Sequence, residues 1–320
     1  MFGCFVDSDD ICVQTTKNKP NNKENPNNKR PNQTTKKLNN QTTKDPNNKK
    51  TKKPNNKRPN QTTKKMISPL AYIHPEAVIG QNCEIGPFCY IDKNVVIGDN
   101  NVLMNSVTIL YGARIGNGNR FFPGAVISAI PQDLKFVGEE TTAEIGDNNT
   151  FRENVTVNRG TAAKNRTIVG NGNLLMEGVH IAHDDIIGNE CIIGNSTKLA
   201  GEVTVDDRAI LSANVLVHQF CRIGSYCMVG GGTGCAQDVL PYSMVARDPA
   251  SYCGLNTVGL RRRGFDRDLV DNIHRAYQII IQGTGLQKDL LTRVETEIPD
   301  SPEIAYILDF IRTSKRGIIK

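Results

Sequence analysis

Several features that would place the chain in a membrane, secreted or metal-binding class are missing from its 320 residues. No run of eighteen apolar residues occurs, which argues against a membrane-spanning helix. The first residues, MFGCFVDSDD, lack the basic stretch and apolar core of a secretory signal. None of the nine cysteines belongs to a CxxC pair, which argues against a zinc ribbon or a redox motif. Without an export signal, these cysteines indicate a reducing, cytoplasmic compartment.

The excess of positive charge is confined to residues 1–65. They hold 16 Lys and Arg against 5 Asp and Glu, whereas the rest of the chain holds 23 against 28. This segment is mostly Asn, Lys, Thr, Pro and Gln, so we expect it to be disordered. One interpretation is a basic arm that binds nucleic acid or an acidic surface. The other is a translated repeat upstream of a start at Met66. The lack of interleaved aromatics favours the second interpretation and no nucleic-acid partner.

From Ile73 to Cys235 an apolar residue returns every six residues. Of the 28 positions in this series, 22 are Ile, Leu or Val. A strand would repeat every second residue and a helix every third or fourth, so neither explains the pattern. Period six is typical of hexapeptide-repeat parallel β-helices, in which three hexapeptides form one triangular coil. The sequence therefore predicts a mainly β protein with a β-helix over residues 66–245.

The repeat also accounts for five cysteines and exposes two interruptions. The cysteines occupy the fifth position of the hexapeptide, where a small residue faces the interior, so we expect core packing and no metal ligation. They are Cys83, Cys89, Cys191, Cys221 and Cys227. Residues 128–143 and 162–167 carry polar residues where the series expects aliphatics. We expect both segments to be loops ejected from the coil, which is where functional residues usually lie.

After Pro241 the period of six ends and helical patterns begin. Residues 266–281 show apolar residues at helical spacing behind an Asp266 N-cap, and residues 286–298 and 301–315 predict two more helices. Pro302 stands at a first helical turn, where proline is favoured. We therefore expect a small helical domain over residues 246–320.

Three of the five histidines, His180, His183 and His218, fall on one side of the predicted rod. Residues 18 apart stack, so the backbone of Gly201 lies beside His183, which Asp184 follows directly. Three interpretations are open. The histidines occupy ordinary solvent-exposed positions, they bind zinc together, or one of them is a general base whose tautomer is fixed by a neighbouring carboxylate. Their convergence favours a functional site.

From Met66 onwards the chain resembles the UDP-N-acetylglucosamine O-acyltransferases, which begin lipid A biosynthesis. The resemblance rests on PQDLKFVGE, NLLMEGVHIAHD, VHQFCRIG, MVGGGTG, AQDV and GLRRRGF, in that order. It implies a left-handed parallel β-helix followed by a C-terminal α-helical domain, assembled as a homotrimer with sites between rods. It also implies transfer of a long-chain (R)-3-hydroxyacyl group from acyl carrier protein to the glucosamine 3-hydroxyl of UDP-N-acetylglucosamine. The carrier thioester is a co-substrate, so no cofactor or metal is expected.

The resemblance also implies roles for individual residues. His183 matches the general base, Asp184 the residue that orients it, and Gly201 the backbone N–H that stabilises the oxyanion. Gly231 matches the far end of the acyl groove, where glycine leaves room for chains of the myristoyl class or longer. The implied substrate-binding residues are Gln132, Asp133 and Lys135 in a loop, His180, His218 and Gln219 on the rod, and Asn256, Arg262 and Arg263 near the diphosphate.

Three alternatives and two departures accompany this resemblance. The related N-acyltransferase of the same pathway carries a uridine-binding domain before its rod, and a zinc-dependent β-helix lyase has no need of the arginine motif. A non-catalytic binding module has no need of the His183–Asp184 pair. Glu202 stands where the family often has a histidine, and Val258 where it often has a glutamate. These departures leave the details of sugar contact open.

Overall fold

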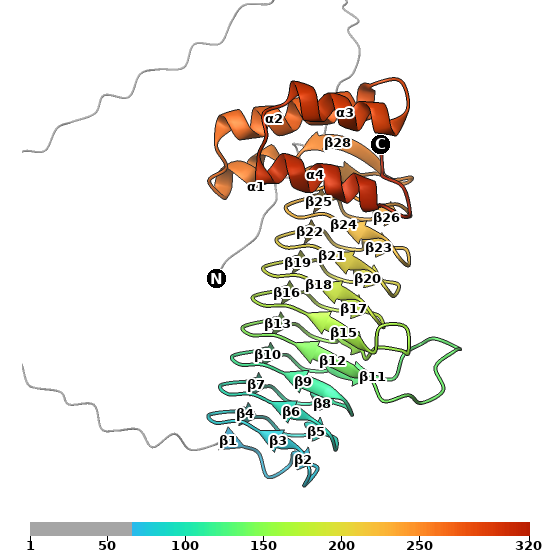
Figure 1. Ribbon diagram of the computed structural model, residues 1–320. Coiled ribbons are helices and arrows are strands. Elements are labelled where there is room, and N and C mark those ends of the chain that lie inside the picture. Colours follow the sequence, from blue (N-terminus) through green and yellow to red (C-terminus); the bar gives the residue numbers. More distant parts are fainter. Residues whose placement is uncertain (1–65) are drawn as a thin grey trace, which may run out of the picture. The chain divides into compact units, whose positions relative to one another are not determined.

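Short parallel strands wind into a rod with three flat sheets in the computed structural model, which describes residues 66–320 (Figure 1). The disorder expected for residues 1–65 lies outside the described residues. Sheet A holds β1 (Met66–Ile67), β4 (Glu84–Ile85), β7 (Val102–Leu103), β10 (Arg120–Phe121), β13 (Thr150–Phe151), β16 (Leu174–Leu175), β19 (Ile192–Ile193), β22 (Ile210–Leu211), β25 (Met228–Val229), β27 (Ser243–Ala246) and the antiparallel β28 (Ser251–Leu255). Sheet B holds β2 (Tyr72–Ile73), β5 (Tyr90–Ile91), β8 (Thr108–Ile109), β11 (Val126–Ala129), β14 (Thr156–Asn158), β17 (His180–Ile181), β20 (Lys198–Leu199), β23 (Leu216–Val217) and β26 (Gly234–Cys235). Sheet C holds β3 (Val78–Ile79), β6 (Val96–Ile97), β9 (Ala113–Ile115), β12 (Thr142–Ile145), β15 (Arg166–Val169), β18 (Ile186–Ile187), β21 (Thr204–Val205) and β24 (Arg222–Ile223).

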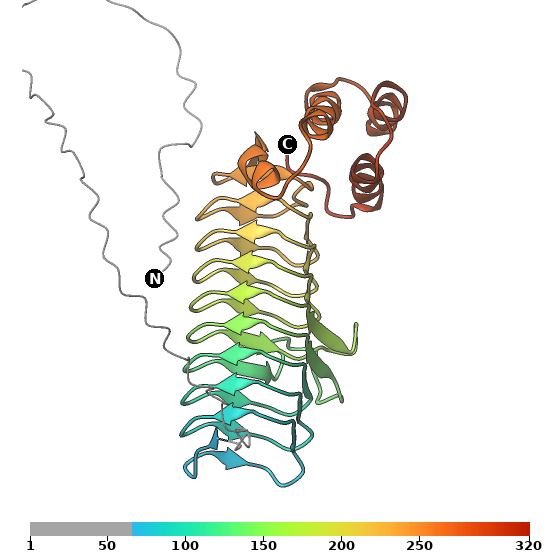
Figure 2. The same cartoon turned by 90° about the vertical axis from the view of Figure 1, so that its left-hand side faces the viewer.

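The chain visits the sheets in the order A, B, C, so the rod has three edges. We name them after the sheets that each turn connects: the AB edge, the BC edge and the CA edge. Successive coils stack along the rod, and the helices lie at its C-terminal end (Figure 2). Residues in equivalent turns of neighbouring coils therefore lie one above another.

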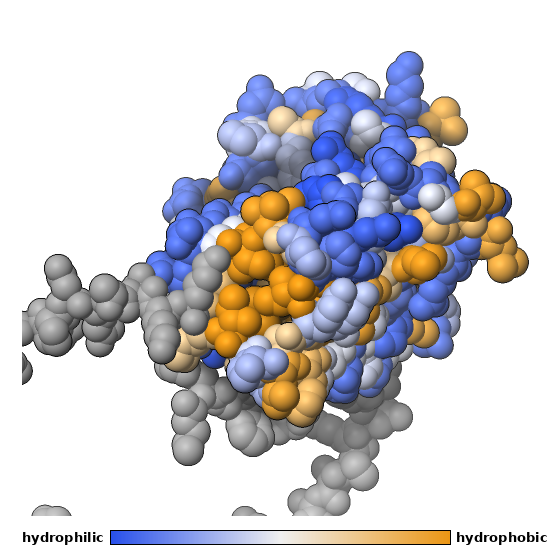
Figure 3. All heavy atoms as spheres, turned by 90° about the horizontal axis from the view of Figure 1, so that it is seen from below, coloured by the Kyte–Doolittle hydropathy of each residue, from blue (hydrophilic) through white to orange (hydrophobic). Residues whose placement is uncertain are grey.

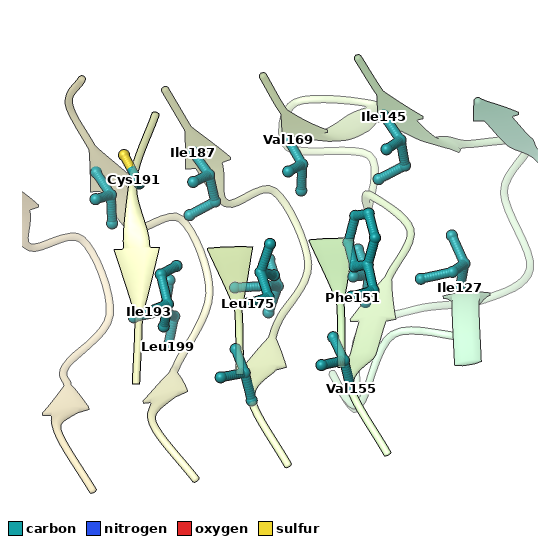
Figure 4. Close-up of a cluster of buried hydrophobic side chains, with 14 of the residues drawn as sticks. Ile127, Ile145, Phe151, Val155, Val169, Leu175, Ile187, Cys191, Ile193 and Leu199 are labelled. Atoms are coloured by element: carbon teal, nitrogen blue, oxygen red, sulfur yellow. The ribbon is translucent and has the colours of Figure 1, made fainter. Parts of the chain in front are cut away.

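The interior of the rod is the stack of apolar side chains that the period of six predicts. In a typical strand the first residue points outwards and the second into the rod, as alternation along a strand requires. Figure 4 shows side chains such as Phe151, Leu175 and Ile193 pointing inwards from successive coils. Phe121 and Phe151 stack with their ring centroids 4.8 Å apart. The predicted β-helix core is confirmed.

Both interruptions are loops whose lengths preserve the period. Met66 pairs with Glu84, 18 residues on, but Arg120 pairs with Thr150 and Thr150 with Leu174. The first loop therefore adds two hexapeptides to its coil and the second adds one. Because whole hexapeptides are inserted, the polar or small members of the series fall in loops while the core keeps its phase.

The fifth position of the hexapeptide holds a hydrogen-bonded ladder as well as apolar residues. The backbone N–H of Asn119 donates to Asn101 Oδ1 at 2.8 Å, and that of Asn149 donates to Asn119 Oδ1 at 2.9 Å. Asn173 continues the ladder one coil further. These asparagines are buried, and their Nδ2 groups donate to glycine carbonyls. The five predicted core cysteines are free and buried, which confirms their packing role.

The first coil exposes residues that later coils bury. Ile67 is 37% exposed, whereas the equivalent Ile85, one coil on, is 2% exposed. Outward-facing Tyr72, Val78 and Phe88 add to an apolar surface at this end of the rod (Figure 3). The exposure of Ile67 follows from its position, because no described coil packs beneath the first one, whereas the other three are exposed because they face outwards.

The C-terminal part forms a small helical domain with its own core. Its elements are α1 (Thr257–Arg262), α2 (Arg267–Tyr277), a π-helical turn η2 (Gln278–Gln282), α3 (Gln287–Glu297) and α4 (Pro302–Thr313). The Asp266 side chain caps α2, and Pro302 opens α4 behind a Ser301 cap, as predicted. The rod's last parallel strand, β27, spans the expected domain boundary at residue 245, and α1 was not predicted. Tyr306 of α4 ties the domain to the rod, donating to Asp206 Oδ2 at 2.6 Å.

Candidate active site

The BC edge carries most of the residues singled out in the sequence. His183 and Asp184 lie in the turn between β17 and β18, and Gly201 lies in the equivalent turn of the next coil. His218 and Gln219 lie one coil further, in the turn between β23 and β24. Both ejected loops also leave the rod at this edge, after β11 and after β14 (Figure 1). The structure therefore places these segments along one edge, as the stacking of 18-residue coils predicts.

Asp184 is completely buried, so its carboxylate requires hydrogen-bond partners. Thr161 donates to it twice, from its N–H to Oδ1 at 3.0 Å and from its hydroxyl to Oδ2 at 2.6 Å. The backbone N–H of Lys164 donates to Oδ1 at 3.2 Å, and His183 Nδ1 lies 2.9 Å from Oδ2. Each of these partners is a donor, which suits a carboxylate that only accepts.

The bond to Asp184 determines which ring nitrogen of His183 is available. Because a carboxylate accepts, Nδ1 carries the proton, and Nε2 keeps its lone pair in the neutral imidazole. The side chain is 9% exposed, and Nε2 faces the backbone of Gly201. His183 is therefore oriented to accept a proton through Nε2.

Gly201 presents a backbone N–H next to this ring. Its φ of +99° lies in the region that favours glycine. A Cβ at this position would lie 2.9 Å from His183 Nε2 and 3.4 Å from Gln219 Nε2, so the close approach also requires glycine. Within residues 66–320 the Gly201 N–H donates no hydrogen bond, whereas that of Glu202 donates to the His183 carbonyl. An unpaired N–H beside a proton acceptor is suited to stabilise a developing oxyanion.

His180 lies three residues before His183, on the outer face of β17. Its Nδ1 is 2.7 Å from the hydroxyl of Thr156 on the preceding coil. Burial, helped by the charges of Lys198 and His183, lowers the pKa of His180 below its ordinary value. Its imidazole is therefore neutral at neutral pH and can offer one donor and one acceptor.

His218 is more exposed and lies beside the C-terminal segment of the chain. Its Nδ1 is 3.1 Å from the Gln219 carbonyl oxygen and 3.3 Å from Arg316 Nη2. Arg316 also donates to the Ala236 carbonyl, so the segment that follows α4 returns to the BC edge. This places a guanidinium that sequence reasoning missed next to a predicted sugar contact.

Known proteins share this architecture over nearly their whole length. A family model described as "Udp N-acetylglucosamine O-acyltransferase; Domain 2" matches residues 238–319. An acyl-[acyl-carrier-protein]--UDP-N-acetylglucosamine O-acyltransferase of Rhizobium rhizogenes is 44% identical over 72% of this chain and 83% of its own. The crystal structure of LpxA, a UDP-N-acetylglucosamine acyltransferase from Bacteroides fragilis, shares 67% identity at a TM-score of 0.79. The match covers 80% of this chain and all of that one. LpxA from Acinetobacter baumannii follows at 38% identity and a TM-score of 0.78, with 80% and 100% covered.

The chain belongs to the UDP-N-acetylglucosamine O-acyltransferase family. Its rod is accordingly a left-handed parallel β-helix, as the resemblance implied. The matched relatives are named as O-acyltransferases, which does not favour the N-acyltransferase or lyase alternatives. Among the described residues, no three His, Cys, Asp or Glu side chains are grouped so that they could hold a metal ion. No helix in residues 66–320 is long and apolar enough to cross a membrane.

The other residues predicted to bind substrate make no hydrogen bond to the dyad within the described residues. The loop with Gln132, Asp133 and Lys135 projects from the BC edge (Figure 1), and none of its hydrogen bonds in the described chain reaches His183. Gly231 lies in a turn of the AB edge, with an ideal Cβ 3.3 Å from the Ala213 carbonyl oxygen.

The arginine motif lies at a third place, on the CA edge. Arg263 contacts Glu190 of that edge at 3.5 Å, and Arg262 is exposed at the end of α1. Asn256 is the N-cap of α1, and its side chain accepts from Gly259 N–H and donates to the Tyr226 carbonyl. Its observed contacts are therefore structural.

The two departures from the family pattern have different surroundings. Glu202 follows Gly201 and lies 3.9 Å from Lys164 Nζ, which also donates to the Asp184 carbonyl at 3.3 Å. The substitution thus places an ion pair at the side of the dyad. Val258 is exposed on α1, and nothing in the structure explains it.

Proposed function

We propose that this chain transfers a long-chain (R)-3-hydroxyacyl group from acyl carrier protein to the glucosamine 3-hydroxyl of UDP-N-acetylglucosamine, the first step of lipid A biosynthesis. The observation that carries the proposal is the buried His183–Asp184 dyad beside the unpaired Gly201 N–H, in a chain of this family. Base, orienting carboxylate and oxyanion donor are the three groups that acyl transfer to a hydroxyl requires.

The proposed mechanism gives a role to each of the three groups: the base, the carboxylate and the backbone N–H. His183 Nε2 accepts the proton of the sugar 3-hydroxyl as its oxygen attacks the thioester carbonyl carbon. The carbonyl oxygen becomes an oxyanion that accepts from the Gly201 N–H, and Asp184 stabilises the imidazolium through Nδ1. The tetrahedral intermediate then expels the carrier thiolate, which takes the proton from His183. The ester forms, the thioester breaks, and the base is restored.

Substrate binding in this proposal needs neighbouring copies of the chain, which supports a homotrimer. The dyad, the arginine motif and Gly231 lie on three different edges of one rod. In a trimer with sites between rods, His180, His218 and Gln219 of one subunit would contact the nucleotide sugar. Arg262 and Arg263 would lie near the diphosphate, because guanidinium groups suit phosphate oxygens. Gln132, Asp133 and Lys135 would enter the site on their loop, while Asn256 acts through the α1 cap.

Apolar side chains on the outer surface also support assembly. Sheet A carries a partly exposed ladder on five neighbouring strands: Leu174, Ile192, Ile210, Met228 and Met244. On the loop after β11, Leu134 and Val137 are 104% and 91% exposed. Contiguous apolar surface of this kind usually marks a protein–protein contact.

The cysteines support a reducing compartment for this reaction. All seven in the described residues are free, and six are buried in the rod. We therefore place the enzyme in the cytoplasm, together with its acyl carrier protein substrate.

The decisive experiment is an acyl-transfer assay with a panel of 3-hydroxyacyl carrier thioesters and UDP-N-acetylglucosamine. Mass spectrometry of the product should show one ester at the sugar 3-position. A matched acceptor with a free amine at the sugar tests the N-acyltransferase alternative in parallel. Transfer only to the amine, or stoichiometric zinc at the histidines with no transfer, would overturn the proposal.

A further inference from the structure

The second ejected loop, residues 159–165, closes over the dyad. It joins β14 to β15 on the coil before His183, and its residues supply three of the donors on the Asp184 carboxylate. Thr161 provides two of them and is 6% exposed. The loop therefore contacts the buried side of the dyad, opposite the Nε2 atom that faces Gly201.

The hydroxyl of Thr161 has a fixed orientation. Its Oγ1 accepts from the N–H of Ala163 at 3.2 Å, so its own proton points to Asp184 Oδ2 at 2.6 Å. Oδ2 is also the oxygen that bonds His183 Nδ1. The threonine hydroxyl and the imidazole N–H thus share one oxygen of a carboxylate that is completely buried.

Hydrogen bonds other than those of this hydroxyl also hold the loop at the edge. The Thr161 carbonyl closes the loop by accepting from Asn165 N–H at 2.7 Å, and two backbone N–H groups remain on Asp184. Removing the hydroxyl therefore takes one donor from Oδ2 and one acceptor from the Ala163 N–H, while the backbone N–H groups of Thr161 and Lys164 stay on Asp184.

We propose that Thr161 is a positioning residue for the acyl transfer, which orients the Asp184 carboxylate so that His183 presents Nε2 to the sugar hydroxyl. The inference rests on the proposed function. It assigns to the loop after β14 a part in the reaction that Asp184 and His183 alone do not explain. The hydroxyl acts through the carboxylate and touches no substrate.

The test compares Thr161→Val, which keeps the shape and the backbone bonds, with Thr161→Ser, which restores the hydroxyl. Thr161→Cys retains a weaker donor and serves if the valine variant does not fold. Thr197→Val is the matched control, because Thr197 is also buried and its hydroxyl donates to a carbonyl on the AB edge. In Thr161→Val we expect kcat to fall about 10- to 100-fold while KM for UDP-N-acetylglucosamine stays within about twofold. Serine should restore kcat, and Thr197→Val should leave it unchanged.

A second readout does not depend on activity. The hydrogen-bonded Nδ1 proton of His183 should give a downfield proton resonance, assigned by its loss in His183→Ala. We expect this resonance to move in Thr161→Val and to return in Thr161→Ser. An unmoved resonance with unchanged kcat in a folded valine variant would overturn the inference. If the wild-type protein shows no acyl transfer but the resonance responds, the proposed function fails while the positioning contact stands.

Discussion

Replacing Gly201 by alanine tests the geometry of the dyad most directly. Two effects are expected, and they can be separated. A side chain at a φ of +99° strains the backbone, which costs about 1–3 kcal/mol of stability. The new methyl would also lie 2.9 Å from His183 Nε2, whereas carbon atoms in contact prefer about 3.5–4.0 Å. The ring must therefore move by about 0.6 Å or more, a displacement that costs about 10- to 100-fold in kcat.

Gly285→Ala provides the control for backbone strain. Gly285 has a φ of +120°, no atom within 4 Å of an ideal Cβ, and a position in the exposed loop between η2 and α3. Chemical denaturation should show a similar loss of stability for both variants, and the acyl-transfer assay should show a loss of kcat for Gly201→Ala alone. The reasoning is refuted if Gly201→Ala keeps kcat within about threefold of wild type, or if Gly285→Ala loses as much.

Three further variants test other parts of the site. His183→Ala should lower kcat by a factor of about 10²–10⁴ without changing the oligomeric state. Near-wild-type turnover of this variant would show that His183 is not the base. Because the pKa of His180 is lowered, the unfolded chain takes up a proton first as pH falls below about 6.5, so stability should decrease there. Lys198→Met should lessen this loss in melting experiments between pH 8 and 5, whereas the exposed Lys93→Met should not. Gly231→Met should favour acyl chains several carbons shorter with unchanged sugar affinity, and unchanged chain preference would disprove the groove assignment.

The fold could be predicted in detail because the β-helix repeats one simple contact. An aliphatic side chain such as Ile85 or Leu175 fills the same place in every coil, so spacing alone reveals the core. The polar side of the repeat was less visible. The period of six does not reveal that Asn119 and Asn149, at the fifth position, accept from the backbone N–H of the next coil. Helix α1 was missed because six residues ending in arginines show no amphipathic pattern.

The candidate site was predictable where it follows the stack and unpredictable where it depends on loops. Coil arithmetic placed Gly201 against His183 because both belong to equivalent turns. The same arithmetic says nothing of how Thr161 folds onto Asp184, since an ejected loop has no repeating partner. Sequence reasoning predicted an ejected loop, where functional residues usually lie, but not its contact with Asp184. Arg316 was missed for a related reason, because its approach to the BC edge depends on how the helical domain packs.

In this regular β-helix the strands supply the packing, and the turns and loops supply the reactive groups of the site. Strand residues that point inwards are committed to packing, and those that point outwards face solvent or a neighbour, so mainly the turns are free to vary. Each turn at the BC edge contributes one or two groups, such as the dyad in one coil and Gly201 in the next. The 18-residue register holds these groups in fixed relation, and the loop with Thr161 adds the buried contact that a bare turn lacks. A single edge supplies base and oxyanion donor, whereas Arg263 lies on the CA edge, which is why the site proposed above sets a different edge of a second copy against the dyad.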